Sequence, residues 1–218
     1  MTEQNQQYLF RMDKTESPLK KEHTGFMSEL YAYVDSSLPI STQDAYVEFI
    51  SGVAKIIGSH KAEFTMNGED SKIFDTKIPR VGKHELKPKT DWGGVSFFIT
   101  SEPENHVEKY LLVKQSITPV NVLGFERHEK KDEHLLVKEG IALFVSSEPD
   151  AMDGKIRRVT LRIALPGDTI TLHPGNIHGV FAVSEKLTLM ETSTYDLDIE
   201  DLIYVFRPVK ASEYASMN

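Results

Sequence analysis

From residue 94 onward, the chain is a close succession of short runs rich in β-branched, aromatic and leucine residues. Turn signals separate most of these runs, among them Pro166-Gly167-Asp168 and Pro174-Gly175-Asn176. Many short strands with regularly spaced turns are typical of an all-β sandwich or barrel. The predicted strands span residues 95–100, 110–118, 122–128, 135–138, 141–145, 157–165, 169–172, 180–183 and 187–192.

The first 60 residues have a different character. Residues 1–20 are polar, so we expect an N-terminal arm that is extended or poorly ordered. In residues 21–60, apolar side chains recur every three or four positions, which predicts a helical hairpin capped by Thr24 and by Ser41 or Thr42, with Gly58 at its end. We expect the hairpin to cover a sheet face, although such a pair could also dock a partner.

Residues 61–218 are assigned to the barrel. Asn67-Gly68 predicts a β-hairpin between residues 62–66 and 71–74, and residues 79–92 resemble a connection rich in Pro, Lys and Gly. A helical turn is expected over residues 196–204. The sequence therefore predicts one barrel that follows directly on the helical hairpin.

Composition excludes several classes of protein. The chain has 218 residues with no cysteine and eight histidines, so disulfides, thiolate zinc sites and a cysteine nucleophile are ruled out. A net charge of −8 argues against a nucleic-acid partner. No apolar run approaches the roughly 18–20 residues that cross a bilayer, and the polar N-terminus lacks the core of a signal peptide, so we expect a cytoplasmic protein without a membrane partner.

Two segments carry residues suited to chemistry. In residues 123–140, Glu126 and His128 are two apart on one predicted strand and share a face, and Glu133 begins the next strand. In residues 167–178, a strand ends in a Pro-Gly turn and the chain returns at His178. One imidazole on each of two hairpins with one or two carboxylates is a mixed nitrogen and oxygen set, suited to Zn, Fe, Mn, Co or Ni.

These two segments resemble the two motifs of the cupin superfamily. In the first motif, G-x5-H-x-H-x(3,4)-E-x6-G, Glu126 takes the first His position, while His128, Glu133 and Gly140 match and Val120 replaces the first Gly. In the second, G-x5-P-x-G-x2-H-x3-N, the residues Gly167, Gly175 and His178 match, whereas His173 takes the Pro position and Ala182 the Asn position.

Within that superfamily, the chain resembles the type II phosphomannose isomerases over roughly residues 90–205. Residues 123–140 align without a gap with L-S-L-Q-x-H-x-x-R-x-E-H-W-x-V-V-x-G, and Asp91-Trp92-Gly93 is similar to the Pro-Trp-Gly that opens that family's barrel. Tyr204 stands where the family has an arginine near its closing segment, so the use of a phosphorylated sugar is in doubt.

The resemblance implies a cupin double-stranded β-helix, a jelly-roll barrel, with an N-terminal helical extension. It implies a divalent metal held by Glu126, His128, Glu133 and His178, and an enzyme that isomerises a sugar or sugar phosphate as a small-molecule substrate. The alternatives are an Fe(II)-dependent dioxygenase and a non-catalytic sugar-binding or regulatory cupin. By analogy we also expect a homodimer, in which the N-terminal arm could exchange between subunits.

Roles for individual side chains follow from this reading. Glu133 is the candidate catalytic base and His173 a second candidate, while Lys114 and Arg162 are the candidate cations for an anionic substrate. Four further expectations concern surface and core positions, namely an outward-facing His134, a solvated turn at Lys130-Lys131-Asp132, a core anchor at Trp92, and capping or solvation of a terminal helix by Glu200 and Asp201.

Overall fold

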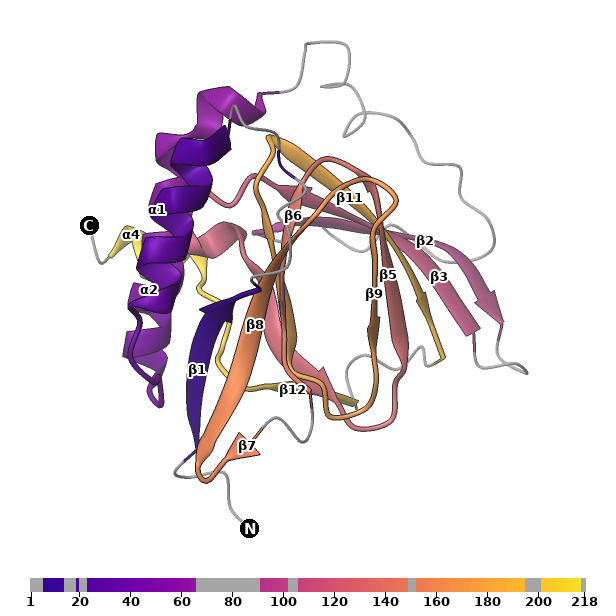
Figure 1. Ribbon diagram of the computed structural model, residues 1–218. Coiled ribbons are helices and arrows are strands. Elements are labelled where there is room, and N and C mark those ends of the chain that lie inside the picture. The colour runs from indigo at the N-terminus through magenta and orange to yellow at the C-terminus, as the bar shows by residue number, and fades with distance from the viewer. Residues whose placement is uncertain are drawn as a thin grey trace.

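Two facing sheets enclose the interior of a barrel, and a pair of helices lies outside one of them (Figure 1). The computed structural model describes residues 6–13, 19, 23–65, 91–101, 106–148, 152–194 and 201–216. Its strands are β1 Gln7–Met12, β2 Gly93–Ser101, β3 His106–Lys114, β4 Leu123–His128, β5 Glu133–Glu139, β6 Ala142–Ser146, β7 Met152–Asp153, β8 Ile156–Ala164, β9 Thr169–Leu172, β10 His178–Ala182, β11 Lys186–Ser193 and β12 Leu202–Tyr204.

The order of strands gives the double-stranded β-helix that the sequence predicts. One sheet is seven-stranded, with the order β1-β8-β6-β10-β4-β12 and β7 beside β8, and the other is five-stranded, with the order β2-β3-β11-β5-β9. The ladders are antiparallel except for the parallel pair of β1 and β8. The predicted barrel with a helical extension is therefore confirmed, and the predicted strand at 110–118 runs instead over His106–Lys114.

Strand β1 lies inside the segment predicted to be a polar arm. Its burial alternates along the strand, so that Tyr8, Phe10 and Met12 face the core. It pairs with β8 of the same chain from Gln7 opposite Ile156 to Met12 opposite Leu161. The predicted homodimer stays a prediction that light scattering can test.

The predicted helical hairpin is present as α1 Thr24–Asp35 and α2 Gln43–Ser59. Thr42 caps α2, because its side chain accepts a hydrogen bond from the Ala45 amide. Thr24 is wrong as a cap: it is the first residue of α1, and His23 precedes it without a side-chain capping bond. Gly58 lies within α2, which ends one residue later.

Two other local predictions differ from the structure, the second of them only in part. Lys61–Phe64 is a short 3₁₀ helix (η2), not the first strand of a hairpin. Of the helical turn expected over residues 196–204, residues 196–200 lie outside the described residues, Asp201 is helical, and Leu202–Tyr204 is a strand, β12, which pairs with the edge of β4. The predicted Asn67-Gly68 turn and most of the connection at 79–92 lie outside the described residues.

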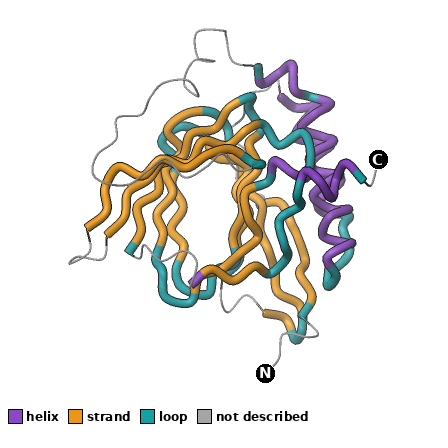
Figure 2. Tube along the Cα trace, turned by 180° about the vertical axis from the view of Figure 1, so that it is seen from behind, coloured by secondary structure: helices purple, strands orange, loops and turns teal. Residues whose placement is uncertain are grey.

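The seven-stranded sheet is buried on both faces, so the molecule has two apolar cores. The first core lies between this sheet and the helices and includes Phe10, Phe49 and Phe125. The second lies between the two sheets and includes Phe144 and Leu189. Figure 2 shows α1 and α2 on one side of the barrel, outside the seven-stranded sheet, and none of the described helices covers the outer face of the five-stranded sheet.

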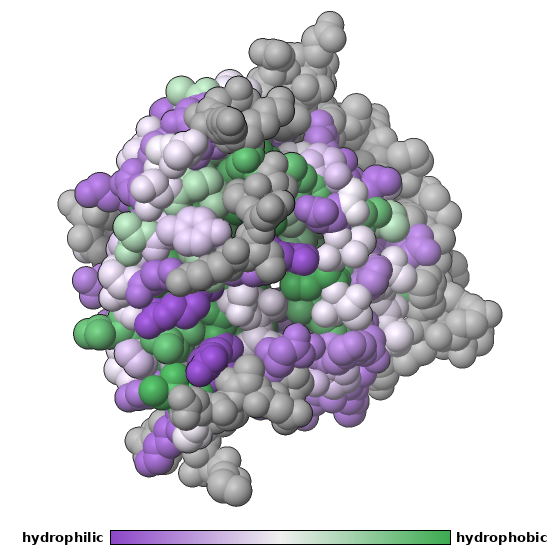
Figure 3. Space-filling model, viewed as in Figure 1, coloured by the Kyte–Doolittle hydropathy of each residue, from purple (hydrophilic) through white to green (hydrophobic). Residues whose placement is uncertain are grey.

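Figure 3 shows the molecule from the same side as Figure 1. Near the centre of this view, hydrophobic residues lie at the bottom of a hollow that polar residues surround. None of the described helices has both the length and the apolar character needed to span a bilayer.

Candidate metal centre

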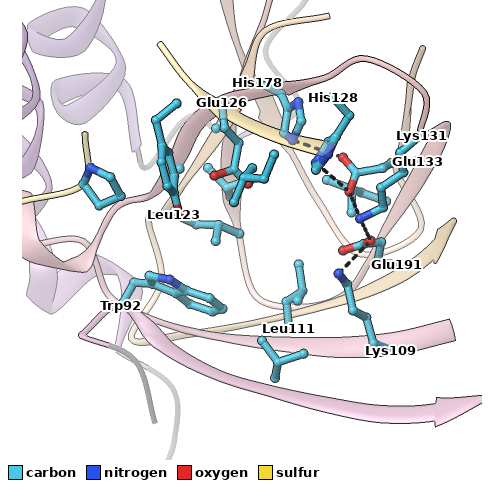
Figure 4. Close-up of a pocket in the computed structure, with 18 residues that line it drawn as sticks. Trp92, Lys109, Leu111, Leu123, Glu126, His128, Lys131, Glu133, His178 and Glu191 are labelled. Carbon is cyan, nitrogen blue, oxygen red and sulfur yellow. Dashed lines mark ion pairs between the residues drawn. The ribbon is translucent and has the colours of Figure 1, made fainter. Parts of the chain in front are cut away.

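The register of two neighbouring strands brings the predicted ligands together. Strands β4 and β10 are antiparallel, with His178 opposite Glu126. His128 lies two residues beyond Glu126 on β4 and therefore on the same face. Ligand atoms of Glu126, His128 and His178 lie within 4.8 Å of one another, on the inner wall of the barrel (Figure 4).

Glu133, the fourth predicted ligand, lies beside this triad. It is the first residue of β5, and its Oε2 is 3.0 Å from Nε2 of His178. Its other oxygen, Oε1, is 3.6 Å from Nε2 of His128. The structure thus places all four predicted metal residues in one cluster, with Glu133 next to both imidazoles.

The far nitrogen of each imidazole has a defined neighbour. Nδ1 of His178 is 3.3 Å from the carbonyl oxygen of Asn176. Nδ1 of His128 is 3.6 Å from Oδ2 of Asp201. The hydrogen-bond contact at Nδ1 of His178 fixes that ring and leaves its Nε2 for a metal, as is usual for metal-binding histidines, while Asp201 lies at ion-pair distance from His128.

Asp201 was expected to cap or solvate a terminal helix, but its carboxylate binds the turn between β4 and β5. Its buried carboxylate accepts hydrogen bonds from the backbone amides of Glu129, Lys130 and Lys131 at 3.0–3.1 Å. It therefore closes the turn between β4 and β5 while it faces His128. Sequence reasoning missed this role because the contact spans about 70 residues of chain.

The cluster opens into a cavity of about 300 Å³ with two unlike walls. In Figure 4 the labelled ionisable side chains run along one side, and Trp92, Leu111 and Leu123 lie on the other. Trp92 is half-buried and lines the cavity as well as packing against the core between the sheets. The cavity can thus hold a small ligand with a polar and an apolar face.

Two lysines lie on the polar wall, and neither was predicted there. Lys131 belongs to the turn that was expected to be solvated, but it is buried, with Nζ 2.6 Å from Glu133 and 2.9 Å from Glu191. Lys109 on β3 has Nζ 3.0 Å from the same oxygen of Glu191. Strand parity carried a signal for Lys109 and Glu191, because Lys109 shares a face of β3 with the buried Val107 and Leu111, and Glu191 shares a face of β11 with the buried Leu189.

Burial and mutual contact shift the pKa values of the carboxylates and of His178. Burial raises the pKa of Glu126 to about 7 and raises that of Glu191, although positive neighbours oppose both shifts. Burial alone would raise the pKa of Glu133, but His178 and Lys131 hold it well below the usual range. Burial lowers the pKa of His178, and Glu133 outweighs this and raises it to about 9.

Three other predicted site residues lie away from the cluster. His173 is exposed, and its Nδ1 is 2.8 Å from Oδ1 of Asp132. Lys114 is exposed at the end of β3 and donates to the carbonyl of Asp91. Arg162 on β8 donates through Nη2 to the carbonyl of Thr169 at 2.8 Å. None of the three lines the cavity that the structure describes.

Strand parity explains why Lys114 lies away from the cavity, whereas a backbone contact explains it for Arg162. On β3 the residues Val107, Lys109 and Leu111 share the inward face, so Lys114 lies on the opposite one. On β8, Leu161 and Ile163 face the helices, and Arg162 alternates with them but reaches a backbone carbonyl instead of the cavity. His134, expected to face outward, is exposed and contacts Thr171 at 2.7 Å.

The cluster fits a divalent cation. Zinc binds imidazole nitrogen and carboxylate oxygen at about 2.0–2.2 Å, so ligands on one ion lie within roughly 4.4 Å of one another. The spacing of the triad is close to this limit, so small side-chain movements suffice. A cation would also offset the cost of burying the carboxylates of Glu126, Glu133 and Glu191 in one cavity.

The known proteins that match this chain do so in structure only. No family model matches the sequence, and neither does any curated relative. Among solved structures, CapF, a capsular polysaccharide assembling protein of Staphylococcus aureus, is 10% identical, with 91% of this chain and 66% of that chain covered and a TM-score of 0.47.

KdgF from Halomonas sp. is 14% identical, with 50% of this chain and 84% of that chain covered and a TM-score of 0.39. Oxalate decarboxylase from Bacillus subtilis is 13% identical, with 56% of this chain and 30% of that chain covered and a TM-score of 0.44. At these identities the activities of the named proteins do not transfer to this chain. The strand order of this chain is that of a double-stranded β-helix, and its ligand cluster is a candidate site for a divalent metal.

Proposed function

We propose that this chain is a metal-dependent isomerase that interconverts an aldose and a ketose. The observation that carries the proposal is the position of Glu133, a buried carboxylate that lines the cavity 3.0 Å from a candidate metal ligand. Isomerisation removes a proton from the carbon next to a carbonyl, so the base must lie close to the cation that binds the carbonyl oxygen.

Each residue of the cluster has a role in this chemistry. A cation held by Glu126, His128 and His178 would supply positive charge to the oxygens of the two reacting carbons. Glu133 takes the proton from one carbon and returns it to the next, while the hydroxyl proton on the first carbon passes to the former carbonyl oxygen. Lys131, with Nζ 2.6 Å from Oε1 of Glu133, keeps that carboxylate ionised and oriented.

A sugar panel tests the proposal. The protein is loaded in turn with Mn²⁺, Zn²⁺, Fe²⁺, Co²⁺ or Ni²⁺ and incubated with aldoses, ketoses and their phosphates, and products are separated by chromatography. We expect at least one pair to interconvert, with the activity lost on chelation and restored by metal. Absence of interconversion across the panel, with metal shown to be bound, would refute the isomerase.

Substitution of Glu133 separates a base from a ligand. Glu133→Gln should lower turnover by about 10²–10⁴-fold, as expected on loss of a general base, while bound metal stays at the wild-type level. His134→Gln is the matched control, because His134 is the next residue of β5 and faces outward. Loss of metal from Glu133→Gln would instead assign this carboxylate to the coordination sphere.

A dioxygenase is the second candidate, and the composition of the triad supports it. Two histidines and one carboxylate with open positions are also the ligand set of non-haem Fe(II) oxygenases. Oxygen uptake by the Fe(II)-loaded protein in the presence of an organic substrate would favour this reading. A protein that binds metal but neither isomerises sugars nor consumes oxygen would point to a binding or regulatory role.

A further inference from the structure

Both lysines that line the cavity are paired with carboxylates that line it too. Lys109 and Lys131 each approach Oε1 of Glu191, at 3.0 and 2.9 Å, and Lys131 also approaches Glu133 at 2.6 Å. All four residues are at most 5% exposed. They form a continuous ion-pair chain, Lys109–Glu191–Lys131–Glu133, along the polar wall of the cavity (Figure 4).

This chain leaves the cavity poorly suited to a phosphate. Among the described residues that line the cavity, Lys109 and Lys131 supply the side chains of the lysine and arginine type. A phosphate that approached either ammonium would lie next to Glu191 or Glu133. Like charges buried together are costly, and a buried ion pair is strongly destabilised when one partner is drawn away.

The same chain suits hydroxyl groups. Ammonium groups donate hydrogen bonds and carboxylates accept them, so the wall offers donors and acceptors side by side for neighbouring hydroxyls. The opposite wall, with Trp92, Leu111 and Leu123, is apolar and suits the C–H face of a ring or chain. At about 300 Å³, the cavity is at the small end of ligand pockets.

We propose that the ligand of this cavity is an uncharged monosaccharide or a related polyol, and that the ion-pair chain selects it against the corresponding phosphate. The inference rests on the proposed function for its substrate class, since it names which sugars the isomerase takes. It concerns binding, however, and binding can be measured without turnover.

Alditols provide that measurement, because they carry the hydroxyls of a sugar but no carbonyl to isomerise. Calorimetric titration of the Mn²⁺-loaded protein with pentitols and hexitols, and with their terminal phosphates, should show at least tenfold tighter binding of the best uncharged alditol. A phosphate that binds as tightly or more tightly overturns the inference, and so does a panel in which no alditol binds.

The two proposals fail in different ways. If uncharged alditols bind selectively but no sugar is turned over, the substrate class stands and the isomerase does not. If sugar phosphates are turned over in preference to free sugars, the isomerase stands and the substrate class does not.

Glu191→Gln tests the ion-pair chain itself. It keeps the shape of the side chain but removes the charge shared by the two lysines, so the preference for the uncharged alditol should fall at least tenfold. Glu185→Gln is the matched control, because Glu185 is an exposed carboxylate just before β11 and does not line the cavity. An unchanged preference in folded Glu191→Gln overturns the inference.

A second variant guards against a folding defect in the first. Lys109→Met removes one donor and keeps the length of the side chain, and it should weaken alditol binding about tenfold while bound metal stays constant. Lys114→Met, on the same strand but exposed, should leave binding unchanged. Thermal unfolding of every variant confirms the folded state, and wild-type alditol affinity in Lys109→Met would remove Lys109 from the site.

Discussion

Glu126 can lie in the cavity because the residue two positions before it has no side chain. Gly124 has φ +56°, in the left-handed region, and a Cβ built there would lie 2.8 Å from Cδ and 2.9 Å from Oε2 of Glu126. Both the backbone conformation and the space next to the carboxylate therefore favour glycine.

Gly124→Ala should weaken metal binding as well as stability. The left-handed conformation alone costs about 1–2 kcal/mol, and the new methyl group displaces the Glu126 carboxylate. Gly154→Ala is a close control, because Gly154 has φ +61° but open space around its Cβ position. Denaturant unfolding should show similar losses in the two variants, whereas metal titration should show weaker binding in Gly124→Ala alone; equal metal affinity would contradict the prediction.

Asp201 links the metal cluster to the turn between β4 and β5. Asp201→Asn removes the charge that faces His128 and weakens the bonds from three backbone amides. Metal affinity should fall about 10–100-fold, as is usual when a partner of a metal-binding histidine is changed. Titration with Zn²⁺ measures this affinity, and Asp132→Asn in the same turn is the control. An unaltered affinity for Zn²⁺ in Asp201→Asn would exclude a role for Asp201 in orienting His128.

At the residue scale, the sequence predicted what local spacing decides. Glu126 and His128 share a face because they are two apart on a strand, and a turn returns the chain at His178 opposite Glu126. The burial of Lys131 could not be predicted in this way, because a distant aspartate holds its turn against the barrel. Lys114 was predicted to face the substrate, but it lies on the face of β3 opposite to Lys109, which lines the cavity.

At the scale of elements, short runs bounded by turns located the strands of the barrel, since apolar content and turn residues are local signals. Strand β1 was not predicted, although Tyr8, Phe10 and Met12 alternate along it. Its neighbour β8 lies about 150 residues away, so nothing near it in the sequence marks the pairing. The buried side chains of β1 belong to the core between the seven-stranded sheet and the helices.

Phe10→Ala tests whether this outer core is integral to the fold. Phe10 is buried and stacks on Phe49 of α2 with ring centroids 4.3 Å apart. Its removal should lower the free energy of unfolding by about 3–5 kcal/mol, as for other buried phenylalanines. Leu38→Ala is the control, because Leu38 is 80% exposed, and should change stability by no more than about 0.5 kcal/mol. A small loss in Phe10→Ala, measured by denaturant unfolding, would show that the helical layer is dispensable.

At the scale of the whole molecule, a cluster of charges at the end of α2 should make stability depend on pH. His60 follows α2, with Nε2 2.9 Å from Glu29 of α1 and Nδ1 2.5 Å from Glu63. Hydrogen bonds to Glu63 and Glu29 raise the pKa of His60, and the bond to His60 lowers the pKa of Glu63. A positive charge at the C-terminal end of a helix is favourable as well.

The sign of the effect follows from these two directions. The raised pKa of His60 adds stability that is fully present below about pH 6.5, the value in an unfolded chain, and is lost as pH rises through the folded pKa. The lowered pKa of Glu63 adds stability that is present above about pH 4.5 and is lost as pH falls through its folded value. Both contributions are therefore complete between these two pH values.

His60→Gln should thus lower the melting temperature more at pH 5.5 than at pH 8.5. Because Glu29 and Glu63 are partly exposed, the pair contributes at most about 1 kcal/mol, which corresponds to roughly 2–4 °C for a chain of this size. High salt should reduce the difference, since these charges are within reach of solvent. His134→Gln is the control, because its neighbour Thr171 carries no charge. Scanning calorimetry at the two pH values decides: a loss that is equal at both would mean that packing of the His60 ring against Phe26, not its charge, joins the helices at this end.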